Sequence, residues 1–149
     1  MKFYFNRTGA RIFDKEEAKE EFYDAFFKRY DIVPVNENYL HFCGELNREL
    51  DVFNVRTIFF SKGRVIIFDA QLDKTYKVPY GSYSVTIHTQ NEIKTISFLC
   101  DGDYDFPSHK VKVDMGSSVI EFELKRDNNN AKDCAEAISF LSKLMKTEE

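Results

Sequence analysis

The chain has no tryptophan, only six glycines, three prolines and three cysteines among its 149 residues. So few glycines leave little material for a glycine-rich phosphate loop, and no G-x-S-x-G nucleophile motif occurs. The cysteines Cys43, Cys100 and Cys134 are widely spaced without a C-x-x-C pair, which favours reduced thiols over a disulfide framework or a zinc site. We therefore expect no cofactor.

Long apolar runs and a signal-peptide core are also missing. A polar stretch at 6–11 follows directly after the first five residues, and no run approaches the roughly 20 apolar residues of a membrane-spanning helix. A net charge of −4 at pH 7 argues against nucleic acid or lipid headgroups as main partners, because both need an excess of Lys and Arg. We expect a cytoplasmic protein without a membrane span.

What the chain does contain is typical of a globular protein. The hydrophobic content is 43% and the charged content 31%, and Phe and Tyr supply an unusually large share of the apolar residues. A chain of this length fits one domain. We expect a single domain over 1–149, with an N-terminal hairpin-helix addition at 1–50 and the main body at 51–146.

The N-terminal part predicts a hairpin at 1–13 and then a helix, which begins at an approximate capping box at Asp14 and ends near Tyr30. The aromatic residues of this helix include Phe22, Phe26 and Phe27. Each needs cover, since burial of a large apolar side chain contributes roughly 1.5 to 3 kcal/mol. Two alternatives stay open: the aromatic face packs on the chain's own sheet, or it binds a partner.

After a loop or short strand at 39–43, runs of alternating apolar and polar residues predict a meander of strands. The seven expected strands are 55–60, 64–69, 74–78, 83–89, 93–100, 109–115 and 119–126. With no helix between them, such strands pair antiparallel and the sheet curls. Residues 131–146 predict an amphipathic helix. The expected fold is α+β, a seven-stranded antiparallel curled sheet or small barrel capped by this helix.

The segment Thr57–Asp69, TIFFSKGRVIIFD, resembles the first hairpin of bacterial pleckstrin-homology-like (PH-like) and GRAM-like domains. The pair Pro79-Tyr80 after the third strand is similar too. The resemblance covers about residues 51–146. It implies a barrel that serves as a non-enzymatic binding module for lipid headgroups or peptides.

Headgroup binding in that family draws on several Lys and Arg residues around the first hairpin. This sequence offers Lys62 and Arg64 there, with Arg56 nearby. Two or three such charges are also ordinary for a solvated hairpin tip. A lipid headgroup is therefore not the partner that we expect.

Two groups of carboxylates could hold a metal ion. Asp101, Asp103 and Asp105 are spaced like the start of a calcium loop, but the later Gly and Glu positions of that loop are not matched. We interpret this segment as a polar loop, with a weak divalent-cation site as the alternative.

The second group is Asp114 with Glu123 and Lys125, which mimics nuclease sites where two carboxylates hold Mg²⁺ and a lysine supports the attacking water. Alternating Glu and Lys on the wet side of an antiparallel strand gives the same pattern without any catalysis. The histidines His41 and His88 lie far from His109 and in no metal-binding spacing, so we expect sheet residues there.

The sequence favours a non-enzymatic interaction module that recognises a protein or peptide, through the aromatic N-terminal helix or through an exposed strand edge. The alternative is a divalent-metal-dependent hydrolase that uses Asp114, Glu123 and Lys125. A third possibility is an immunity-type or phage-type inhibitor protein, which would also be acidic and compact.

Overall fold

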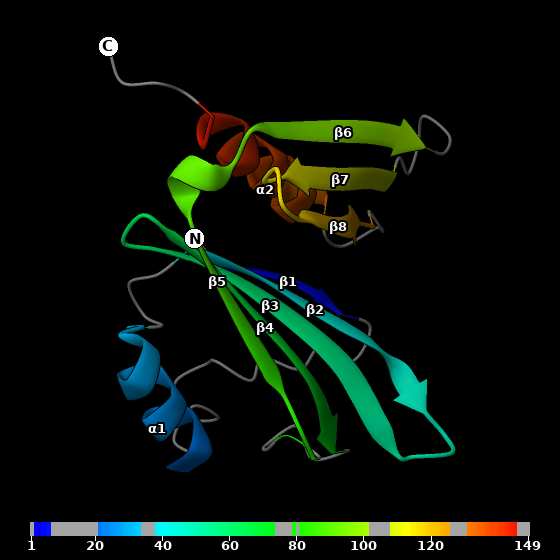
Figure 1. Ribbon diagram of the computed structural model, residues 1–149. Helices are drawn as coiled ribbons and strands as arrows, with labels where there is room; N and C mark the ends of the chain where they lie inside the picture. The colour runs from blue at the N-terminus through cyan, green and yellow to red at the C-terminus, as the bar shows by residue number, and fades with distance from the viewer. Residues whose placement is uncertain are drawn as a thin grey trace. The chain divides into compact units, whose positions relative to one another are not determined.

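The computed structural model describes residues 2–6, 21–33, 38–73, 79, 81–101, 108–125 and 131–145 (Figure 1). The chain divides into two compact units, Met1–His88 and Thr89–Glu149. In the described residues, each unit combines a β-sheet with an α-helix.

The first unit contains a five-stranded sheet with the strand order β1-β2-β3-β4-β5. β1 runs parallel to β2, whereas β2 with β3 and β3 with β4 pair antiparallel. The strands are β1 (Lys2–Asn6), β2 (Asn38–Asn47), β3 (Val52–Ser61), β4 (Arg64–Asp73) and β5 (Ser84–Thr89). The second arm of the hairpin predicted at 1–13 and the strand predicted at 74–78 lie outside the described residues.

The hairpin of β3 and β4 confirms the clearest turn prediction in the sequence. Ser61 pairs with Arg64, so Lys62 and Gly63 form a two-residue turn. Both turn residues have positive φ angles, 53° and 74°. Such a turn has the twist that fits two antiparallel strands, and glycine adopts this conformation without the steric cost of a Cβ.

Strand β2 is longer than the sequence suggested. Tyr39, Leu40 and His41 are consecutive and all buried, so both faces of the strand are covered at this point. A strand that is buried on both faces lacks the polar-apolar alternation that normally reveals a strand. The part of β2 that the sequence did not predict lies beyond Cys43, where the pairing with β3 shifts register and resumes at Leu46, so the length of the strand depends on β3 more than on a local pattern.

Helix α1 (Glu21–Tyr30) supplies aromatic side chains to the core of the first unit. The helix confirms the described part of the prediction, whose first turns at 14–20 lie outside the described residues. The fully or nearly buried core residues are Phe26, Phe27, Ile32, Tyr39, Phe53, Val55, Phe59, Ile66, Phe68, Ala70 and Leu72. This face of β2, β3 and β4 therefore packs against α1.

The second unit contains a three-stranded sheet with the order β6-β7-β8 and the C-terminal helix. β6 pairs antiparallel with β7, and β7 pairs antiparallel with β8, in both cases without a register shift. The elements are β6 (Thr95–Asp101), β7 (Ser108–Asp114), β8 (Val119–Leu124) and α2 (Ala131–Lys143). A short 3₁₀ turn at Gln90–Glu92 precedes β6.

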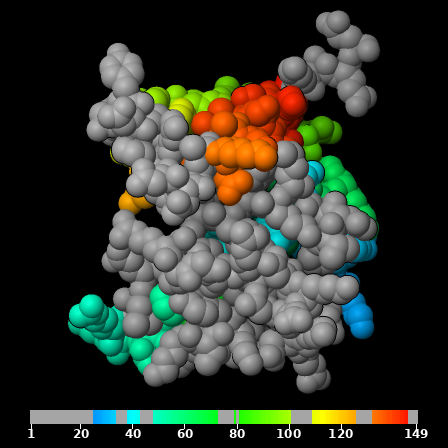
Figure 2. Space-filling view, turned by 180° about the vertical axis from the view of Figure 1, so that it is seen from behind, coloured from blue at the N-terminus to red at the C-terminus, as the bar shows by residue number. Residues whose placement is uncertain are grey.

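One face of this sheet is apolar and packs with α2. The buried residues of the unit are Val111, Val113, Met115, Ile120 and Leu124 of the sheet side and Cys134, Ala137 and Leu141 of the helix. Figure 2 shows the outer side of α2, in orange and red, at the surface. The predicted amphipathic helix is confirmed, because its apolar row is buried at Cys134 and Leu141 while Lys132 is exposed.

The chain is an α+β protein of mostly antiparallel sheets with a C-terminal helix, as the sequence predicts. The described strands form two separate sheets of five and three strands and do not close into one barrel. Among the described residues, no helix is both long and apolar enough to cross a membrane.

Candidate functional site

The open face of the β6-β7-β8 sheet carries a shallow groove. Its volume is about 450 Å³, and residues of all three strands line it. The side chains on this face include Ser97 and Leu99 of β6, Lys110 and Lys112 of β7, and Glu121 and Glu123 of β8. The opposite face packs with α2, so the groove is on the side of the sheet that the helix leaves open.

Register places the charges of the groove in columns. Lys110 lies opposite Glu123, and Lys112 lies opposite Glu121. Residues directly opposite each other in an antiparallel pair share one face, so each lysine neighbours one glutamate. The middle strand is therefore cationic and β8 anionic on this face.

The β6 side of the same groove is uncharged. Leu99 lies opposite Lys110, and Ser97 lies opposite Lys112. Leu99 has 61% of its surface exposed, which makes it the most exposed of the large apolar side chains among the described residues. Among the strands that the structure describes, β6 has a neighbour on one side only, so this apolar side chain stands at the margin of its sheet.

Two of the three predicted partner-binding aromatics lie inside the core instead. Phe26 is 1% and Phe27 is 6% exposed. The ring of Phe26 lies 4.9 Å from that of Phe68, and the ring of Phe27 lies 6.3 Å from that of Phe59, centroid to centroid. Of the two alternatives for this helix face, packing on the chain's own sheet is the one found for these rings. Phe22 belongs to α1, but its side chain lies outside the described residues.

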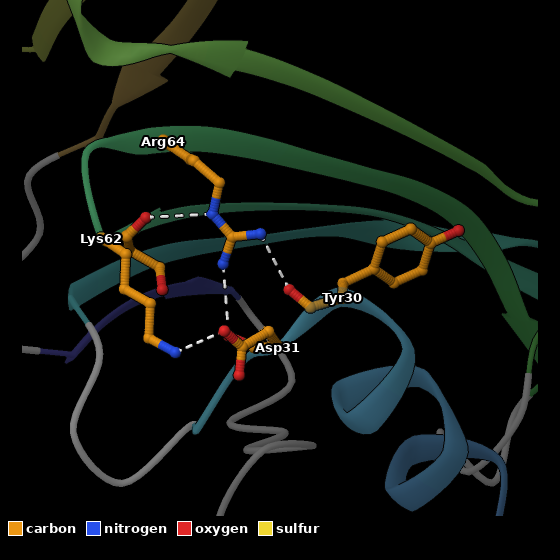
Figure 3. A network of polar contacts seen from close by, with 5 residues as sticks. Tyr30, Asp31, Lys62 and Arg64 are labelled. Carbon is orange, nitrogen blue, oxygen red and sulfur yellow. Dashed lines mark hydrogen bonds and ion pairs between the residues drawn. The ribbon is translucent and has the colours of Figure 1, made fainter.

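Lys62 and Arg64 hold the end of α1 (Figure 3). The Arg64 guanidinium donates from Nη1 to the Tyr30 carbonyl at 3.0 Å and from Nη2 to the Asp31 carbonyl at 3.2 Å. The last carbonyls of a helix have no partner within the helix, so a cation placed there both satisfies them and complements the helix dipole. The hairpin tip that suggested headgroup binding thus serves as a C-terminal cap of α1.

Lys62 completes this contact from the turn. Its Nζ donates to Asp31 Oδ2 at 2.5 Å. The hydrogen bond and the charge of Lys62 lower the pKa of Asp31 below its ordinary value of 3.8. Both side chains are well exposed, so this ion pair contributes little by itself.

The proposed nuclease residues do not converge. Asp114 lies opposite Val119, whereas Glu123 lies opposite Lys110, four residues away along β7. Four residues of a strand span about 13 Å, which is several times the distance at which two carboxylates share one Mg²⁺. The register therefore contradicts a shared metal site of Asp114 with Glu123 and Lys125.

Asp114 has a structural role in the turn after β7. Its Oδ1 accepts a hydrogen bond from the Gly116 N–H at 2.8 Å, and the Met115 N–H donates to the Ser118 carbonyl at 2.9 Å. A carboxylate that bonds to the backbone two residues on is a common way to stabilise a turn. The signal in the sequence is Asp-Met-Gly-Ser, a turn sequence.

The other carboxylate group is only partly described. Asp101 is the last residue of β6, and Asp103 and Asp105 lie outside the described residues. In the part of the chain that the structure describes, no three His, Cys, Asp or Glu side chains come together as metal ligands. Cys100 is an exposed free thiol, and Cys134 is buried.

The core of the first unit contains a polar pair that the sequence does not predict. His41 and Thr57 are fully buried and lie opposite each other on β2 and β3, with a 2.8 Å hydrogen bond between His41 Nδ1 and Thr57 Oγ1. Burial lowers the pKa of His41 from 6.5 to about 3. The imidazole is therefore neutral at physiological pH, and it is a sheet residue, as the sequence suggested for all three histidines.

Comparison of the chain with protein-family models, with curated proteins and with solved structures found no match.

Proposed function

We propose that this chain is a non-enzymatic binding module that takes up an extended segment of a protein or peptide along the free edge of β6. The observation that carries the proposal is the position of β6 at the margin of its sheet, with Leu99 and Cys100 exposed. An edge strand presents backbone N–H and C=O groups that an added strand can pair with.

The residues of β6 support binding over protection of this edge. Proteins usually protect an edge strand with lysine, proline, a bulge or an inward-pointing charge. The stretch Thr95–Cys100 has neither a charged residue nor proline, and its ladder with β7 has no bulge. By contrast, β8 at the other margin of the sheet carries Glu121 and Glu123.

The order of the elements also supports the PH-like resemblance, which we include in the proposal. Within residues 51–146 the described strands β3 to β8 are followed by α2, and antiparallel strands followed by one C-terminal helix is the order of a PH-like domain. Domains of that class are mostly binding modules, although a fold alone does not assign a function. An exposed free thiol at Cys100 fits a reducing compartment, so we propose a cytoplasmic location.

The test is a selection of random displayed peptides on the immobilised full chain, followed by affinity measurement on the most enriched peptide by fluorescence anisotropy. The same measurement is made on Leu99→Lys, which places a charge on the exposed margin of β6 and leaves the core untouched. Circular dichroism and urea unfolding check that the variant is folded.

The matched control is Ile87→Lys. Ile87 is 48% exposed on β5, which lies at the margin of the other sheet, so the change in charge and size is the same type of change on a different edge. We expect Leu99→Lys to reduce the affinity and Ile87→Lys to preserve it. Loss of binding in Ile87→Lys alone, or a selection that enriches no peptide, would show that β6 is not the binding edge.

A further inference from the structure

The groove beside β6 also indicates which segments would bind. Resting on the proposed function, we infer that the segment bound along β6 carries an acidic side chain two residues from an apolar one. In this arrangement the acidic group faces Lys112 and Lys110 across Ser97, and the apolar group contacts Leu99.

Among the four charges that line the groove, the two lysines lie nearer to a bound segment than the two glutamates do. A strand added to β6 lies about 5 Å from β6 and about 10 Å from β7, because neighbouring strands are evenly spaced. Ser97, the β6 residue opposite Lys112, has a small side chain that leaves room above it. The four-carbon stem of lysine and the two-carbon stem of glutamate together can bridge such a gap.

The glutamates lie one strand further away. Glu121 and Glu123 belong to β8, and so stand about 14 Å from a segment added to β6. The positive charges of the groove therefore lie nearer to β6 than its negative charges do, while Asp101, the one carboxylate residue of β6 itself, comes at the end of the strand beyond Leu99. Charge complementarity then favours an acidic segment over a basic one.

The glutamates that lie opposite Lys110 and Lys112 do not prevent these lysines from attracting an acidic segment. Lys110 and Lys112 are exposed on the open face of β7. Exposed ion pairs contribute little, so a lysine can turn toward a second carboxylate at small cost, or hold both. A bound acidic side chain thus adds an attraction without breaking a buried contact.

The apolar half of the preference comes from Leu99. Side chains on one face of a strand recur every second residue, and the same holds for a segment added beside it, whether parallel or antiparallel. Ser97 and Leu99 are two residues apart on the same face, so the acidic and the apolar side chain of the segment are also two apart. The inferred recognition pattern is acidic-x-apolar in an extended chain.

The test uses the peptides selected on the wild-type chain. The double variant Lys110→Gln/Lys112→Gln removes the two charges near β6, and its control Lys132→Gln/Lys143→Gln removes two exposed charges from α2. We expect the selected peptides to be enriched in the acidic-x-apolar pattern. We expect the β7 variant to lose about tenfold in affinity, roughly threefold for each exposed charge pair, and the α2 variant to lose less than about twofold.

Replacing the acidic residue of the peptide by its amide removes both charge pairs at once, so it should also cost wild type about tenfold, and this cost should vanish in the β7 variant, as in a double-mutant cycle. One result would overturn this inference and leave the proposed function intact: Leu99→Lys abolishes binding, but the peptides show no acidic preference and the β7 variant binds them as wild type does. Binding that ignores Leu99→Lys would overturn the proposed function itself. A concentration-dependent dimer that Leu99→Lys dissociates would show that a second copy of the chain occupies the edge, and it would also overturn the inference.

Discussion

His41 and Thr57 form a buried polar pair between β2 and β3, with 2.8 Å between Nδ1 of the imidazole and Oγ1 of the hydroxyl. Both residues lie on strands that carry the aromatic core, and neither has exposed surface. A buried imidazole resists protonation because a charge in this environment loses its hydration. The pair therefore links the stability of the first unit to pH.

Stability should fall as the pH drops below about 6.5. The pKa of His41 is about 3 in the folded chain, whereas it is 6.5 when exposed, so between these values only the unfolded chain binds the proton. Proton uptake by the unfolded state lowers the free energy of unfolding by about 1.4 kcal/mol per pH unit, or about 2 kcal/mol from neutral pH to pH 5. Urea unfolding near these two pH values measures the difference.

The variant His41→Gln removes this proton uptake and keeps a polar group beside Thr57. Its stability at neutral pH should be lower than that of wild type, but it should change less between neutral pH and about pH 5. His88→Gln keeps His41 and serves as the control. An equal pH dependence in wild type and His41→Gln would show that His41 does not cause it.

Phe26 should be a strong determinant of the stability of the first unit. Its ring is buried against Phe68 and tilts against Tyr30 at 5.1 Å. Truncation to alanine loses the transfer free energy and leaves a cavity, so Phe26→Ala should cost about 3 to 5 kcal/mol of unfolding free energy. Leu50→Ala, at an exposed turn position, should change it by less than about 0.5 kcal/mol. Similar effects of the two changes in urea unfolding would contradict the role of α1 in the core.

Arg64 and Lys62 should differ in what they contribute to α1. Arg64→Ala leaves two carbonyls at the end of the helix without their donor, and it should destabilise the unit by about 1 to 2 kcal/mol. Lys62→Ala removes an exposed ion pair and should cost less than about 1 kcal/mol. Arg64→Lys should restore only part of the loss, since a single ammonium cannot match the two-pronged guanidinium. Amide hydrogen exchange in α1 reports both changes, and equal exchange rates in Arg64→Ala and wild type would refute the capping role.

The predictable parts of this fold are those with a local cause. The turn at Lys62-Gly63 follows from the conformational freedom of glycine, and α2 follows from its apolar row. β2 could not be predicted at its full length, because the part beyond Cys43 follows a register shift and depends on its pairing with β3. The parallel pairing of β1 with β2 joins segments more than thirty residues apart, and no local pattern encodes it.

The candidate sites also have parts that a local pattern predicts and parts that depend on the fold. Alternation correctly puts Glu123 on the face of β8 that faces solvent, but only the register of β7 and β8 shows that Asp114 lies far along the strand. The basic hairpin tip is visible in the sequence, yet its use as a helix cap depends on where α1 docks. The edge position of β6 is likewise a property of the whole sheet.

Gly116 offers a test of whether backbone conformation or side-chain space dominates in the turn after β7. Its φ angle is +84°, and a Cβ at this position would lie 2.7 Å from Cε of Lys94. The end of a lysine side chain moves easily, whereas a positive φ costs an alanine about 1 to 2 kcal/mol wherever its neighbours are. Gly116→Ala should therefore destabilise the second unit by about this amount, and adding Lys94→Ala should recover only a minor part of the lost stability.

Gly63→Ala is the matched comparison, because Gly63 also has a positive φ, +74°, and no described atom lies within 4 Å of the added Cβ. Only the backbone contributes there, and the cost in stability should be similar. Urea unfolding of the single and double variants measures the costs, and full recovery in the double variant would show that the contact with Lys94 is the dominant cause.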